Sequence, residues 1–356
     1  TPLTGITITT DVLTAAAIKS TGTLSVTNSG TSSITGIISD GSTALAVTKA
    51  GAGTLTLSAA NTYTGSTTIS AGTVAISTAT GLGTTAGATT VSSGAALEIS
   101  GTIIVAEPIT IAGTGVSSGG AIKFTSGNNT YSGDITLAAS TPLINSTGGQ
   151  QTISGAINGA QALTITASDS LTLSGTIGAT APPSSLSVTT TGTGVLALNA
   201  NVSTSGTQTY TAAGGITINA NRTLTTTPSA ALITLASELN GNSNSLTISG
   251  NAAINGAITS VTTLSVSGTT SLGASITTSG DQTYSGNATL TAASTLTTTS
   301  NGNISFGGTI ANASAQNLTL DTGLTSGTIS VTGAVGSGTA LGTITISKSA
   351  GTTFSS

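Results

Sequence analysis

The chain has 356 residues, of which 4% are charged and 2% aromatic, and small residues dominate it, with 48 glycines. It contains no Cys and no His, which excludes a disulfide scaffold, thiolate metal sites and the commonest catalytic triads and zinc sites. The net charge of −4 comes with only five Lys and Arg residues, so we expect no nucleic-acid binding.

Regularly spaced Ile, Leu and Val residues, together with a positive mean hydropathy, indicate a folded chain rather than a disordered one. No apolar stretch has the roughly 18 residues that a membrane-spanning helix needs, so we expect no membrane insertion in this segment. Thr1 does not open a charged segment followed by an apolar one. We therefore expect a mature chain or a piece of a longer one.

Short strands are predicted along the whole length, because large aliphatic residues alternate with Thr, Ser or an occasional charge. The alternation places Glu98 and Lys123 on the outward side of their strands. It is clearest in the following segments: 24–26, 45–47, 55–57, 74–76, 97–99, 122–124, 163–165, 171–173, 186–188, 246–248, 318–320, 329–331 and 344–346.

Gly, Asn, Ser and Asp separate these strands, and no window shows the period of a helix. Many short strands with few aromatic residues could form a β-sandwich or a β-solenoid. A sandwich needs a broad core of bulky residues, whereas a solenoid has a narrow core in which small aliphatic residues stack from coil to coil. We therefore predict an all-β fold, a parallel β-helix (β-solenoid) of about 15 coils.

The four tyrosines, Tyr63, Tyr131, Tyr210 and Tyr284, all lie in a phrase of the form Asn/Gln-Thr-Tyr-Thr/Ser. Such repetition indicates a degenerate repeat, with the phrases about three coils apart. We interpret the tyrosines as structural repeat markers, each ring covering a coil edge where the chain turns. The alternative is that the rings are exposed contacts for a partner.

One continuous β-solenoid is expected over residues 1–356. Two prolines, Pro182 and Pro183, cannot donate to a central ladder, so a loop or joint is expected at 181–185.

Residues 51–77 resemble the passenger-associated strand repeat of bacterial autotransporters. They contain a Gly-Thr-Leu-Thr-Leu strand at 53–57, an Asn-Thr-Tyr-Thr-Gly turn at 61–65 and Ala-Gly-Thr-Val at 71–74. Residues 104–137 are similar to the segment that commonly follows this repeat. The strand repeats of this type are assigned to 1–140, and residues 141–356 are similar to filamentous-haemagglutinin-type adhesin repeats. The resemblance implies a right-handed β-helix at the bacterial cell surface or secreted, and it carries over no catalytic residues.

The residues offer little chemistry beyond this. Stacked coils could bring two acids together, as in β-helical enzymes that cleave polysaccharides, but the aromatic sugar platforms and basic residues of such clefts are missing. We therefore expect no catalytic, cofactor-binding or metal-binding residues and no enzyme activity. The nine acids are scattered along the chain: Asp11, Asp40, Glu98, Glu107, Asp134, Asp169, Glu238, Asp281 and Asp321.

The sequence thus predicts a non-enzymatic extracellular structural protein, either the β-helical rod of a surface adhesin or a subunit of an extracellular fibre. Its expected partners are further copies of itself or other surface polymers. A glycan- or host-binding adhesin module is the alternative. Ice binding is a minor one, suggested by Thr-x-Thr segments such as 7–9 and 343–345.

Overall fold

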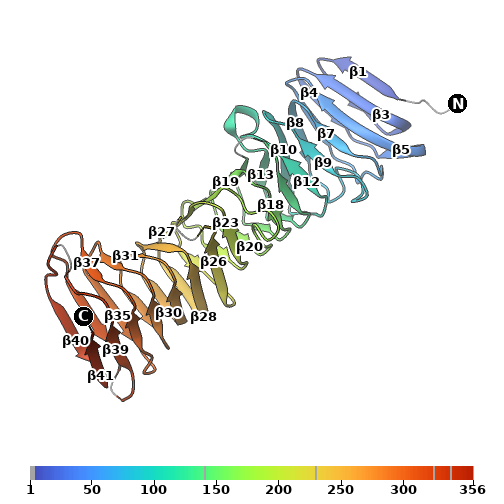
Figure 1. Cartoon of the computed structure of the whole chain (residues 1–356). Coiled ribbons are helices and arrows are strands. Elements are labelled where there is room, and N and C mark those ends of the chain that lie inside the picture. Colours follow the sequence, from blue (N-terminus) through green and yellow to red (C-terminus); the bar gives the residue numbers. More distant parts are fainter. Residues whose placement is uncertain (1–4, 140–141, 229–230, 324, 337–338, 356) are drawn as a thin grey trace. The chain divides into compact units, whose positions relative to one another are not determined.

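The computed structural model describes residues 5–139, 142–228, 231–323, 325–336 and 339–355. The chain divides into two compact units, Thr1–Ser184 (unit 1) and Ser185–Ser356 (unit 2) (Figure 1). Each unit is a parallel β-solenoid, and the chain makes about 16 turns in all, which confirms the predicted fold class. The handedness of the helix stays a prediction. Within the described ranges, the one helix is a short 3-10 turn, Val116–Ser118.

Unit 1 contains three columns of strands, in each of which a strand pairs in parallel with the one a turn later. The first column is β1 (Ile6–Thr10), β3 (Ile18–Asn28), β5 (Ile38–Ala50), β7 (Thr67–Ile69), β9 (Thr89–Val91), β12 (Ile109–Ile111), β15 (Ile135–Leu137) and β18 (Ile157–Asn158). The second is β2 (Thr14–Ala15), β4 (Thr31–Ile34), β6 (Thr54–Leu57), β8 (Gly72–Ile76), β10 (Ala95–Ser100), β13 (Ile122–Ser126), β16 (Leu143–Ser146) and β19 (Ala162–Ala167). The third is β11 (Ile104–Val105), β14 (Thr130–Tyr131), β17 (Gln151–Ile153) and β20 (Leu171–Leu173).

Unit 2 also has three columns, and its long strands β28 (Leu239–Ser249) and β30 (Ile258–Val266) run through two of them. Column A adds β22 (Leu196–Leu198), β25 (Ile216–Thr217), β32 (Ile276–Thr278), β35 (Ser294–Thr298), β38 (Leu318–Asp321) and β40 (Ile344–Lys348). Column B adds β23 (Val202–Thr204), β26 (Arg222–Thr226), β33 (Gln282–Tyr284), β36 (Ile304–Phe306), β39 (Thr328–Val331) and β41 (Gly351–Phe354). Column C is β21 (Ser185–Thr190), β24 (Gln208–Ala212), β27 (Leu232–Leu235), β29 (Asn251–Ile254), β31 (Thr270–Leu272), β34 (Ala288–Leu290) and β37 (Ile310–Asn312).

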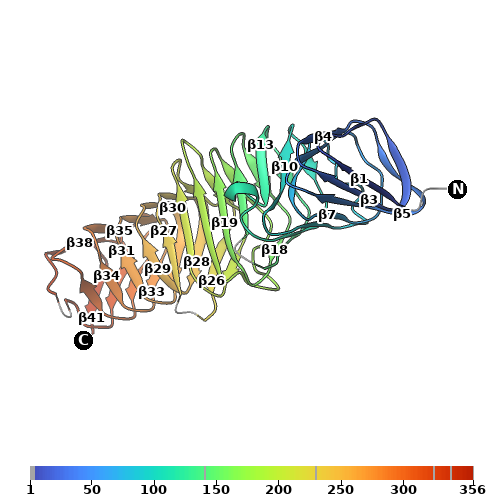
Figure 2. The same ribbon diagram turned by 90° about the horizontal axis from the view of Figure 1, so that it is seen from above.

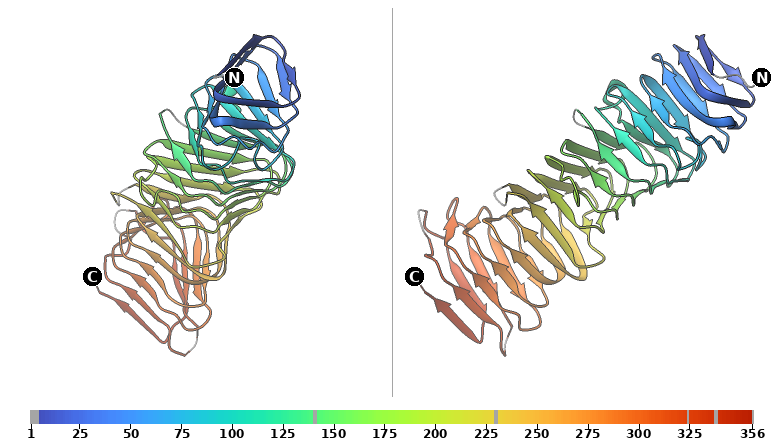
Figure 3. Two further views of the ribbon diagram at one scale, coloured as in Figure 1. Left: turned by 90° about the vertical axis from the view of Figure 1, so that its right-hand side faces the viewer. Right: turned by 45° about the vertical axis from the view of Figure 1, so that its right-hand side comes forward.

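The strands of each unit lie side by side, as Figures 2 and 3 show from other directions. The core of each unit consists of inward side chains stacked in register, as a narrow solenoid core requires. In column B of unit 2, buried residues follow one another turn by turn: Leu224, Ile248, Val266, Tyr284, Phe306 and Val331.

In the first column of unit 1, one file of outward positions carries seven hydroxyl side chains and then an amide. Its residues pair in register over eight strands: Thr7, Ser25, Thr48, Thr68, Thr90, Thr110, Thr136 and Asn158. Burial of the alternate side chains explains the short three-residue strands, because one outward residue flanked by two inward ones is enough to form a rung.

Glycines mark one corner of unit 2, where successive turns approach closely. The column consists of Gly250, Gly268, Gly286, Gly308 and Gly333. A Cβ atom at Gly286 would lie 2.4 Å from the carbonyl oxygen of Gly268, so no larger residue fits without moving a backbone. Beside this corner, the Asn287 Oδ1 accepts a hydrogen bond from the Thr309 amide of the next turn at 3.0 Å.

The prolines that the structure describes lie outside the strand interiors. Pro108 and Pro142 directly precede β12 and β16, in keeping with strand entries. Pro182 and Pro183 lie between β20 and β21, in a segment without strand structure.

Candidate functional site

The four tyrosines lie in the core, and each has 0% exposure. Their rings are therefore not available to a partner in the folded chain. Burial raises the pKa of each phenol above its ordinary value, because the phenolate form would be poorly solvated. Their interpretation as repeat markers stays a prediction.

In unit 2 the two Gln-Thr-Tyr phrases form the same hydrogen-bonded corner. The Tyr210 hydroxyl donates to Gln208 Oε1 at 2.8 Å, and the Gln208 amide donates to Thr204 Oγ1 at 3.1 Å and to the Thr225 carbonyl at 2.7 Å. The Thr204 hydroxyl in turn donates to the Gly206 carbonyl at 2.6 Å.

The corner at Tyr284 repeats these bonds with equivalent residues, but it occupies a different column. Tyr284 donates to Gln282 at 3.0 Å, and Gln282 donates to Thr278 at 3.2 Å. However, Tyr210 lies in column C and Tyr284 in column B, where it stacks on Phe306 with the ring centroids 4.9 Å apart. The phrase therefore specifies a type of corner and not a fixed position on the coil.

The two Asn-Thr-Tyr phrases of unit 1 also bridge neighbouring turns, but through an Asn. Asn61 accepts from the Ile38 amide at 2.8 Å and donates to the Gly81 carbonyl at 2.7 Å. The Tyr63 hydroxyl bonds Thr67 Oγ1 at 2.6 Å, and the Tyr131 hydroxyl donates to the Glu107 carbonyl at 2.7 Å. The structure therefore places the four tyrosines in separate corners, although Tyr63 and Tyr131 both interact electrostatically with one buried residue, Glu107.

Two buried charged residues escaped sequence reasoning. Glu107 is 3% exposed, and burial raises the pKa of its carboxyl to about 7. Lys49 is 0% exposed, and burial lowers the pKa of its amine to about 8.

The Lys49 ammonium is surrounded by backbone carbonyls. It donates to the carbonyls of Ala50 at 2.6 Å, Gly51 at 2.7 Å and Ala71 at 3.2 Å. Its strand neighbours in the column are Val26 and Ile69, so the charge occupies a position that is otherwise aliphatic. This arrangement satisfies the amine and leaves it no room to meet a substrate.

Two of the remaining acids lie close to lysines on paired strands. Glu98 and Lys123 face outward on paired strands as predicted, with their charged atoms 3.0 Å apart. The Asp321 and Lys348 side chains approach to 4.0 Å. Among the residues that the structure describes, no group of three metal-ligating side chains comes together.

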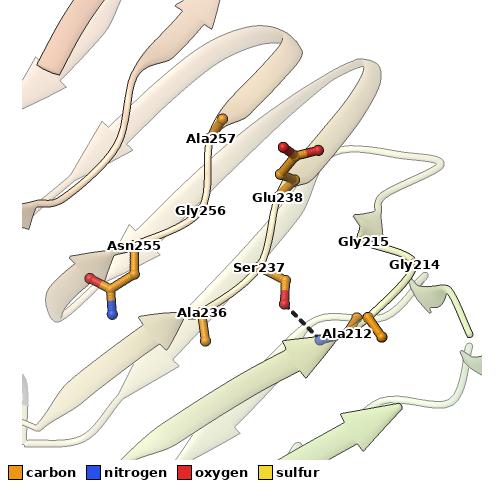
Figure 4. Close-up of a pocket in the computed structure, with 10 residues that line it drawn as sticks. Ala212, Gly214, Gly215, Ala236, Ser237, Glu238, Asn255, Gly256 and Ala257 are labelled. Atoms are coloured by element: carbon orange, nitrogen blue, oxygen red, sulfur yellow. Dashed lines mark hydrogen bonds between the residues drawn. The ribbon is translucent and has the colours of Figure 1, made fainter. Parts of the chain in front are cut away.

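A hollow of about 540 Å³ opens between three successive turns of unit 2 (Figure 4). Its lining includes Gly214, Gly215, Ser237, Glu238 and Asn255. The Ser237 hydroxyl oxygen accepts a hydrogen bond from the Ala212 amide at 2.9 Å. Glu238 is the one charged residue of the lining. A single exposed carboxylate among small residues has no partner for acid–base work.

No helix in the described ranges is both long and apolar enough to cross a membrane. No curated protein and no solved structure matches the chain. The family model of the passenger-associated transport repeat matches residues 47–76, which run from the end of β5 through β6 and β7 to the end of β8. This match and the parallel β-solenoid fit the β-helix of an autotransporter passenger.

Proposed function

We propose that the chain is the β-solenoid part of an autotransporter passenger and has a structural, non-enzymatic role outside the cell. It would serve as the rod of a surface adhesin or as a subunit of an extracellular fibre. The passenger repeat at residues 47–76, built into continuous columns of paired strands, is the observation that carries the proposal.

The interior of each unit supports a mechanical role. Backbone hydrogen bonds join each turn to the next, and the core side chains stack in register without disulfides. The polar groups of the Tyr and Asn/Gln corners bond to one another and to the backbone of neighbouring turns. Side-chain chemistry is thus used to hold turns together.

Neither alternative function gains support from a specific observation. Glycan sites commonly use exposed aromatic faces, and Phe354 alone among the seven aromatic residues is exposed, at 47%. A flat ice-binding array would need two parallel files of threonines. The row of paired outward residues that starts at Thr9 continues to Thr27 and is then interrupted by Ala50, so the second row of threonines ends after two turns.

The location is tested on intact source bacteria with antibodies raised against the purified chain. Surface labelling and cleavage by an added protease are the expected results. Protection of the chain until the cells are permeabilised would overturn the location.

The structural role is tested separately by electron microscopy of native material and by a glycan array. Filaments or surface projections that carry the antibody epitope support the role. Strong binding of the purified chain to defined glycans, without any such projections, would favour the adhesin module instead.

A further inference from the structure

Glu107 is a buried carboxyl that the proposed function does not use. It lies between β11 and β12, and the flanking Val105 and Ile109 are 0% and 2% exposed. The Pro108 carbonyl accepts a hydrogen bond from the Thr89 amide at 2.9 Å, and the Glu107 carbonyl accepts one from the Tyr131 hydroxyl. The backbone around the carboxyl is therefore held by both neighbouring turns.

The carboxyl itself has little to stabilise a charge. Its Oε1 atom receives one long bond from the Thr89 hydroxyl at 3.5 Å, and its Oε2 atom is buried without a hydrogen-bond partner. A buried carboxylate that lacks hydrogen bonds and a counter-ion is strongly disfavoured relative to its neutral form.

The titratable groups around Glu107 do not supply a counter-ion. Tyr63 and Tyr131 are the two that interact with it electrostatically, and both are neutral phenols. The two ion pairs within the described ranges, Glu98–Lys123 and Asp321–Lys348, do not include it. Among the residues with a described position, no cation thus offsets a negative charge on Glu107.

We propose that Glu107 makes unit 1 an acid-stabilised solenoid, which takes up a proton when it folds near neutral pH. This device concerns the stability of unit 1 and goes beyond the proposed structural role.

The direction of the effect follows from proton linkage. The carboxyl has its pKa raised from 4.5 to about 7 by burial, so the folded state binds more protons than the unfolded state between these values. The stabilisation is fully present below pH 4.5 and is lost as the pH rises through 7. Across this window we expect the unfolding equilibrium constant of unit 1 to increase by about 100-fold.

The titration can be observed directly, because the chain has three glutamates, Glu98, Glu107 and Glu238. The full chain with ¹³C-labelled glutamate carboxyls gives three signals to follow by NMR as a function of pH. We expect one signal to titrate near neutral pH and to disappear in Glu107→Gln. Three signals that all titrate in the ordinary glutamate range would overturn the proposal.

Stability is measured in the same full chains by hydrogen exchange, corrected for the intrinsic pH dependence. The amides of β12 and β15 report on unit 1, and those of β30 provide the internal reference. Wild type should lose protection at β12 and β15 from pH 4.5 to 7, whereas Glu107→Gln should not. The matched control Glu98→Gln, in an ion pair whose side chains are 30% exposed, should keep the wild-type dependence.

If the protection of β12 and β15 in Glu107→Gln falls with pH as it does in wild type, the proposal is contradicted. If that variant does not fold, the assignment is made by elimination with Glu98→Gln and Glu238→Gln. The carboxyl signal that titrates near neutral pH must then persist in both variants. If either variant lacks it, the signal belongs to the substituted glutamate and the assignment to Glu107 is refuted.

Discussion

Replacement of Gly286 by alanine tests whether the stability of unit 2 depends on the close approach of successive turns at its glycine corner. The added Cβ would lie 2.4 Å from the carbonyl oxygen of Gly268, 2.5 Å from its carbonyl carbon and 2.8 Å from the amide nitrogen of Thr269. Favourable contacts between heavy atoms lie at roughly 3.5 Å, so the two turns would have to separate by about 1 Å.

Such a separation would stretch the bonds that join these turns. The Ser285 amide donates to the Val266 carbonyl at 2.9 Å, and the Thr270 amide donates to the Asn287 carbonyl at 2.8 Å. The obstacle is backbone and not a flexible side chain, so we expect a cost at the upper end of overpacking, about 3 kcal/mol in the free energy of unfolding.

Urea unfolding followed by far-UV circular dichroism and tyrosine fluorescence measures the loss. Gly351→Ala in the same unit is the matched control, because its nearest neighbour would be the Thr328 Cγ2 atom at 3.8 Å. The control should stay within about 0.5 kcal/mol of wild type. If Gly286→Ala changes stability as little as Gly351→Ala does, the steric reasoning is refuted.

Three further outcomes are expected. Tyr284→Phe keeps the stack on Phe306 but leaves the buried Gln282 Oε1 without its donor, which should cost about 1–2 kcal/mol in urea unfolding; an unchanged midpoint would argue against this corner. Because the pKa of all four tyrosines is raised in the folded state, the free energy of unfolding should fall above the ordinary phenol pKa of about 10. Phenolate absorbance should therefore appear together with the loss of circular dichroism. Gradual ionisation of the tyrosines in an intact fold would contradict this expectation. Lys49 has its pKa lowered from 10.5 to about 8, so the unfolded state binds more protons in that window and unit 1 should gain up to about 3 kcal/mol as the pH rises from 8 to 10. Lys49→Met should lack this gain. If the stability of Lys49→Met depends on pH as that of wild type does, Lys49 is not the group responsible.

The strands could be predicted from the sequence because their side chains alternate with a period of two. The segment 97–99 shows this clearly, since Leu97 and Ile99 are buried and Glu98 faces outward. The same alternation places Lys49 inward after Val47 and Thr48, so a signal for its burial was present. A charged residue is normally expected at the surface, which hides that signal.

The burial of Glu107 could not be predicted in the same way. It follows the two-residue strand β11 and precedes a proline, so no local alternation determines its direction. Contacts with Thr89 and Tyr131, one turn to either side, enclose it. Likewise, the Gln-Thr-Tyr phrase predicts a corner, but the lengths of the intervening turns decide whether it falls in column B or column C.

The pairing of each strand with the strand one turn away has a consequence for how the chain can acquire its structure. A completed turn presents its successor with carbonyl acceptors, a side-chain acceptor such as Asn287 Oδ1 and an apolar surface of matching shape. Closing one turn costs much the same loop entropy wherever it occurs, and each strand pairing of the described residues joins neighbouring turns. A chain that forms its turns in order from one end can therefore be templated turn upon turn, each addition stabilising the turns already formed.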